Sequence, residues 1–336
     1  MTTALPEGEA LAAQDLNVKR SRFPGVAAMR ATSGFQRGTL VFGLILLTFF
    51  VVLAVFAPWI APYGFDQTGV GAKLFPTQSP PSAQHWFGTT VDGFDVLSRV
   101  VFGAQTALEV IVLAVFIAIV VGVPLGLLSG YYGGALDRVL VLIADSLFVF
   151  PTLLLAIVVV VTVSGGGSGK WSSIFATAIA ITVVYVPQYF RVVRNATVAA
   201  REEPYVEAAR AIGASPGAIM RRYVFGNVVQ TVPVIATLNA GDAILTLAGL
   251  GFLGVGIEPT AAADWGHDLN TAVQNDVSNG FWWSGVYPGI AIALVVLSVT
   301  LVGESLNDVL NPLLRTSKIT KVVFPKRRAE AEDGTE

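Results

Sequence analysis

Six long, predominantly apolar stretches recur along the chain and are separated by polar links. Inside a bilayer every backbone N–H and C=O must be bonded internally, so stretches of roughly 20 apolar residues are typical of membrane-crossing helices. The strands of a membrane barrel would alternate apolar and polar residues, whereas these stretches are continuously apolar. We therefore expect an all-α polytopic membrane protein with six spans, at about 40–60, 107–128, 140–163, 174–189, 228–247 and 285–302.

The composition of the 336 residues supports a bilayer as the solvent. Hydrophobic residues make up 54% of the chain and charged residues 13%, against about 25% charged residues in an average soluble domain. So few charges would not cover the surface of a water-soluble protein of this size. The net charge of −2 also argues against binding of nucleic acid through bulk charge.

Lysine and arginine are distributed unevenly between the links. Eighteen of them lie before the first span, between spans two and three, between spans four and five, or after the last span. The opposite side has only Lys73 and Lys170, with Arg99 near an interface. The positive-inside rule then predicts that both termini are cytoplasmic. We expect a cytoplasmic N-terminal segment at 1–38, a six-helix domain at 39–310 and a cytoplasmic tail at 311–336.

The cytoplasmic link between spans four and five contains the most informative polar segment, REEPYVEAARAIGASPGAIMRRYVFGN at 201–227. Pro204 suits the first turn of a helix, and Gly213 suits its end. Ser215-Pro216 is a start signal for a second helix. The residues alone allow two interpretations: a docking knob held between two spans, or an amphipathic helix lying at the membrane interface.

Within this link, Glu207-Ala208-Ala209 followed by Gly213 resembles the EAA loop of ABC importer permeases. In that family the loop, here about 194–227, forms a coupling helix that sits in a cleft of the cytoplasmic ATPase. Phe225-Gly226 stands where the family usually has Leu-Pro, which leaves the kink at the start of the fifth span open. The residues that the resemblance assigns to the contact are Tyr205, Glu207, Ala208, Ala209, Gly213 and Ser215.

Four further blocks extend the resemblance over nearly the whole chain after about residue 35, and they are similar to dipeptide/oligopeptide/nickel permeases. Thr90 replaces the usual acid and Phe94 the usual Arg, so any polar role of those positions is lost. The blocks are APWIAPY at 57–63, HWFGT with DVLSR within 85–99, GYYGG with Asp137, Asp145 and Pro151 within 130–151, and FLGVG with Pro259 and Trp265-Gly266 within 252–266.

This resemblance implies a type I ABC importer permease in a bacterial plasma membrane, without catalytic residues or a cofactor of its own. The implied partners are a second homologous permease, two ATP-binding ABC subunits that hold ATP and Mg, and an external substrate-binding protein. Peptide is the expected cargo, and nickel or another small solute is the alternative.

Two other classes of protein agree less well with the residues. An ion-coupled secondary transporter would usually show internal repeats and a relay of buried acids, and neither is visible. An intramembrane enzyme is the weakest interpretation, because HExxH and GxSxG are absent. The chain also lacks Cys, and its two histidines, His85 and His267, have no second ligand at metal-binding spacing.

Ionisable groups inside spans are costly and therefore functional candidates. Asn239 and Asp242 in the fifth span are candidates for the translocation path, with hydrogen bonding between helices as the alternative. Glu109 and Asp145 lie nearer to span ends, where snorkelling or a local hydrogen bond explains them. The glycine-rich segment 164–170 lacks the spacing of a phosphate-binding loop, so we expect a flexible turn there.

Overall fold

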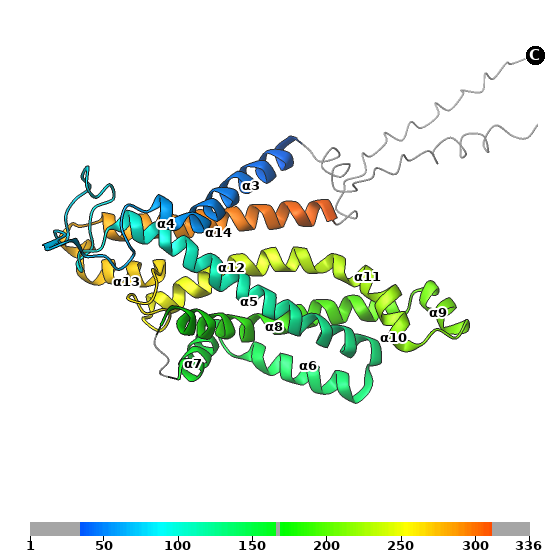
Figure 1. Cartoon of the computed structure of the whole chain (residues 1–336). Helices are drawn as coiled ribbons and strands as arrows, with labels where there is room; N and C mark the ends of the chain where they lie inside the picture. Colours follow the sequence, from blue (N-terminus) through cyan, green and yellow to red (C-terminus); the bar gives the residue numbers. More distant parts are fainter. Residues whose placement is uncertain (1–33, 166–168, 311–336) are drawn as a thin grey trace, which may run out of the picture.

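The computed structural model describes residues 34–165 and 169–310 as a bundle of long helices (Figure 1). The tail predicted at 311–336 and nearly all of the N-terminal segment predicted at 1–38 lie outside these ranges. The long helices are α3 (Gly34–Val55), α5 (Val96–Tyr132), α6 (Gly134–Val149), α7 (Thr152–Ser164), α8 (Lys170–Arg201), α12 (Val232–Phe252) and α14 (Trp283–Leu310).

Shorter elements occupy the two ends of the bundle. At one end lie α4 (Ala57–Ile60), the antiparallel strands β1 (Gly69–Val70) and β2 (Lys73–Leu74), α13 (Trp265–Asn275) and the 3-10 turn η4 (Val277–Asn279). The other end carries α9 (Pro204–Ala211), α10 (Pro216–Ile219), the π-helical turn η2 (Met220–Val224), α11 (Phe225–Val228) and the 3-10 turn η3 (Val229–Thr231).

Five of the predicted spans are confirmed as helices long and apolar enough to cross a membrane within the described residues, and the third predicted span is broken. Helices α6 and α7 make a sixth crossing only if the pair is counted together, since they meet at 102°. The break falls at Pro151, which removes a backbone donor and disfavours the helical conformation at the preceding residue. Phe150 is accordingly extended, with φ −78° and ψ 135°. The expectation of one helix over 140–163 was therefore wrong.

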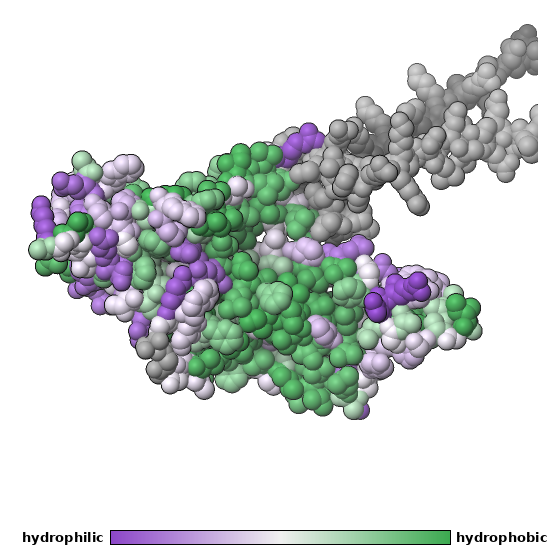
Figure 2. Space-filling model, viewed as in Figure 1, coloured by the Kyte–Doolittle hydropathy of each residue, from purple (hydrophilic) through white to green (hydrophobic). Residues whose placement is uncertain are grey.

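On the face shown in Figure 2, apolar residues form a belt across the middle of the bundle, and hydrophilic residues gather at both ends. Inside the belt, α5 and α8 pack closely because glycines face α8 at one position per turn. A Cβ added at Gly122, Gly126 or Gly130 would lie 2.7 Å from an atom of α8. Small residues at this spacing allow two helix backbones to approach each other. The α5–α8 pair thus forms a rigid centre that links the two polar ends.

The path from the link after α8 into α12 stays helical. Residues from Pro216 to Phe252 form one candidate span, with the π turn η2 and the 3-10 turn η3 inside it. Pro233 lies in the first turn of α12, where its missing N–H leaves no partner unsatisfied. The chain therefore reaches the fifth span without the Leu-Pro kink, through local changes in helix pitch.

Candidate functional site

Residues 204–228, here called the knob, project from one end of the bundle (Figure 1). Gly213 has φ +84°, a conformation that costs a residue with a Cβ. The N–H groups of Gly213 and Ala214 donate to the carbonyls of Arg210 and Ala209, which is the Schellman pattern of a helix end. Ser215 then caps α10, and its Oγ accepts from the N–H of Ala218 at 3.4 Å. The predicted helix, stop and restart are thus confirmed.

The underside of the knob is attached to the bundle by a hydrophobic cluster of its own. Val206 and Ile219 are fully buried, and they pack together with Val193 of α8 and Leu127 of α5. Ala209 belongs to the same cluster and is only 3% exposed. The resemblance assigned Ala209 to the contact with the ATPase. That assignment is wrong for Ala209, because its side chain faces this chain's own core.

The outer face of the knob is uncovered. Tyr205, Glu207 and Ala208 are exposed on α9, and the Tyr205 hydroxyl accepts a hydrogen bond from Nδ2 of Asn227. Gly213 and Ser215 are exposed as well, so five of the six residues assigned to this contact lie on accessible surface.

Ile212 was not among the predicted contact residues, yet its side chain is 82% exposed at the tip of the knob. Its spacing of three residues from Ala209 predicts burial on the same helix face. Ile212 is instead the C-cap residue of α9, where the chain leaves the helix and the side chain turns outward. The sequence signal that could have identified Ile212 is its position directly before the helix-ending Gly213.

A polar network holds the neighbouring helix ends beside the knob. Arg194 of α8 makes two hydrogen bonds to the carboxylate of Asp137 on α6, and Ser129 of α5 donates to the same group. Nη1 of Arg201 donates to the carbonyl of Gly130 at 2.9 Å. Asp137 and Gly130 belong to the GYYGG block, so the network gives this motif a structural role.

The two residues predicted for the translocation path lie one turn apart on α12 and face different ways. Asn239 is buried beside Tyr189 of α8, whereas Asp242 is exposed. The structure therefore does not place both side chains on one surface. The two acids predicted near span ends are both paired: Glu109 with Lys170 at 2.9 Å and Asp145 with Arg191 at 2.7 Å.

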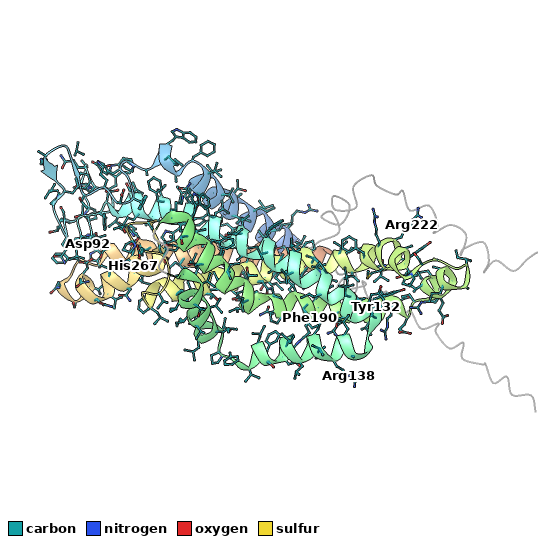
Figure 3. All side chains as sticks on the ribbon, turned by 60° about the horizontal axis from the view of Figure 1, so that its bottom comes forward. Asp92, Tyr132, Arg138, Phe190, Arg222 and His267 are labelled. Atoms are coloured by element: carbon teal, nitrogen blue, oxygen red, sulfur yellow. The ribbon has the colours of Figure 1, made fainter. Side chains whose placement is uncertain are left out.

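The opposite end of the bundle contains Asp92 and His267, while Arg138 and Arg222 lie at the end with the knob (Figure 3). Here Asp95 caps α5 through the N–H of Ser98 and pairs with Nδ1 of His85 at 2.9 Å. Arg99, only 1% exposed, pairs with Asp268 at 2.6 Å. Within the described ranges no three His, Cys, Asp or Glu side chains could hold a metal ion.

Burial governs the acid–base properties of this end. Burial raises the pKa of Asp264 to about 7, although the hydrogen bond that its carboxylate accepts from the N–H of Gly266 lowers this pKa. It also raises the pKa of Asp268, although the neighbouring Arg99 acts in the opposite direction. The desolvated imidazole of His267 has a lowered pKa.

Comparison with known proteins supports the picture obtained from the residues. Residues 122–316 match the family described as binding-protein-dependent transport system inner membrane component, and residues 36–81 match the N-terminal transmembrane domain of oligopeptide transport permease C. A dipeptide transport system permease of Alkalihalophilus pseudofirmus is 37% identical over 82% of this chain and 86% of its own length. A glutathione transport system permease of Shigella sonnei is 38% identical over 79% of this chain and 83% of its own length.

Proposed function

Because this chain belongs to the family of binding-protein-dependent transport system inner membrane components, we propose that it conducts peptides across the membrane as one subunit of an ATP-driven importer. Peptide is chosen as the cargo because the two relatives described above are named for dipeptide and glutathione transport. A second, homologous permease completes the path. Two separate ATPase subunits, which carry ATP and Mg, supply the energy, and an external binding protein delivers the cargo.

The observation that carries this proposal is the construction of the knob. Its underside is locked to α5 and α8 through Val206 and Ile219, and its tip presents Ile212 to the surroundings. A partner that moves the tip would therefore move the spans as well. A helix resting on the lipid interface, the alternative interpretation, would need neither a rigid underside nor an isolated apolar tip. We place the knob and both termini in the cytoplasm.

Substitution of the tip tests the proposal. In the assembled complex, Ile212→Asp should remove most of the co-purified ATPase and of the ATP hydrolysis stimulated by loaded binding protein, because a central apolar anchor typically contributes 2 kcal/mol or more, or roughly 30-fold in affinity. Val273→Asp is the matched control, since Val273 is an exposed valine on α13 at the opposite end. If the ATPase content is equal in the two variants, the docking role of the knob is wrong.

A further inference from the structure

Asp242 is a carboxylate inside a membrane span. It lies midway along the 21 residues of α12, about 15 Å from each end at 1.5 Å per residue. The candidate span that contains α12 runs from Pro216 to Phe252, so Asp242 lies well inside it. Among the described residues no cation forms an ion pair with Asp242, whereas Glu109, Asp137 and Asp145 each have a basic partner.

Three sides of α12 are covered by other helices of this chain. Gly241 faces Thr300 of α14, and Gly249 faces Leu153 of α7. The hydroxyl of Thr246 bonds to that of Tyr185 on α8 at 3.0 Å. The remaining face presents Asp242 between the exposed side chains of Leu238 and Leu245. A carboxylate facing hydrocarbon is costly, which favours a water-filled path over lipid as the surroundings of this face.

The polar groups beside Asp242 do not compensate its negative charge. Thr246 donates to the backbone carbonyl of Asp242 at 2.9 Å rather than to its carboxylate. Tyr185 is engaged with Thr246. The described part of this face therefore carries a negative charge and no positive one. Such a face lowers the energy of a passing cation and raises that of a passing anion.

From these contacts we infer that Asp242 selects cargo that carries a positively charged ammonium group, such as the free N-terminus of a peptide. An ammonium offers three donors, and a carboxylate accepts charge-assisted hydrogen bonds from them. This inference rests on the proposed function, since it names the chemical class that the peptide path prefers. It concerns the crossing step and not capture by the binding protein.

The test uses the full complex in proteoliposomes, with the binding protein saturated by either trialanine or N-acetyl-trialanine. The measured quantity is the ratio of ATP-driven uptake of the free peptide to that of the acetylated one. Asp242→Asn should lower this ratio about tenfold, the loss expected for a hydrogen bond to a charged group, while Asp242→Glu keeps most of it. Glu258→Gln, which removes an exposed carboxylate from an outer loop, should leave the ratio unchanged.

Three outcomes would overturn the inference. A ratio that changes less than twofold in Asp242→Asn, with the complex intact and uptake still driven by ATP, would show that the carboxylate does not select cargo. Loss of the second permease from Asp242→Asn complexes would show that the residue pairs across the subunit interface. Absence of ATP-driven peptide uptake by the wild-type complex would overturn the proposed function, and this inference with it.

Discussion

Gly213 shows how one residue sets the geometry of the knob. Its φ of +84° ends α9 and redirects the chain into α10, and a Cβ added there would meet nothing within 4 Å. The effect of a substitution therefore comes from the backbone conformation alone and not from crowding inside this chain. The role of Gly213 can therefore be tested by comparing side chains that tolerate a positive φ to different degrees.

We predict that Gly213→Val strains the turn by about 1–2 kcal/mol and lowers the amount of ATPase that co-purifies with the permease, while all spans remain inserted. Gly213→Asn should retain more of the ATPase, because Asn tolerates the left-handed conformation. Equal ATPase content in both variants and the wild type would contradict a role for this turn.

The buried carboxyl of Asp264 predicts a pH dependence of stability at the end opposite the knob. Its pKa is raised from 3.8 to about 7 in the folded chain, so the folded state holds the proton more tightly than the unfolded state does. The stability contributed by that proton is fully present below the ordinary value of 3.8 and is lost as the pH rises from there through about 7. We expect the melting temperature of the purified protein to fall between about pH 4 and pH 7 and to level off above that range.

Asp264→Asn is the informative variant for this pH dependence, because Asn still caps a helix but does not titrate. The fall in melting temperature should become smaller, with the remainder coming from Asp268, whose pKa is also raised. An unchanged pH dependence in Asp264→Asn would show that this carboxyl is not the titrating group.

At the scale of elements, the close contact of α5 and α8 depends on the absence of side chains at single positions. A Cβ at Gly126 would lie 2.7 Å from the carbonyl oxygen of Phe190, which belongs to the backbone of α8 and is not free to rotate away. The same contact supports the knob, because Leu127 and Val193 from these helices contribute to its hydrophobic cluster.

We therefore predict that Gly126→Ala destabilises the protein by about 1–3 kcal/mol through overpacking, measured as a lower melting temperature in detergent. Gly38→Ala is the matched control, since Gly38 lies in α3 with no atom within 4 Å of an added Cβ. Its melting temperature should equal or slightly exceed that of the wild type, because Ala favours a helix over Gly. Identical melting temperatures for the two variants would mean that α8 moves aside at little cost.

For the molecule as a whole, the uneven distribution of lysine and arginine between the two polar ends predicts which end faces the cytoplasm. The native chain has no Cys, so single cysteines report their own side. Thr260→Cys, on an exposed outer loop, should react with an impermeant maleimide in intact cells. Ala218→Cys, exposed on the knob, should react only after the cells are permeabilised. Labelling of Ala218→Cys in intact cells would reverse the orientation and remove the docking role.

The features that depend on adjacent residues could be predicted from the sequence alone. Continuous apolar stretches identify membrane helices because each stretch must satisfy its own backbone hydrogen bonds. Pro204, Gly213 and Ser215 mark the helix, stop and restart of the knob because the conformational preferences of these residues are local. The family resemblance rests on the same local blocks.

Which face of each helix is covered, and how far the chain turns at Pro151, can be seen only in the folded arrangement of the helices. The spans are apolar on all sides, so their periodicity does not separate the face against a neighbouring helix from the face against lipid. For this reason Asn239 proved to be buried and Asp242 open, although both had been assigned to the path. The pair between Arg99 and Asp268 joins residues 169 positions apart, and such a contact follows from the folded arrangement of helices rather than from any local pattern.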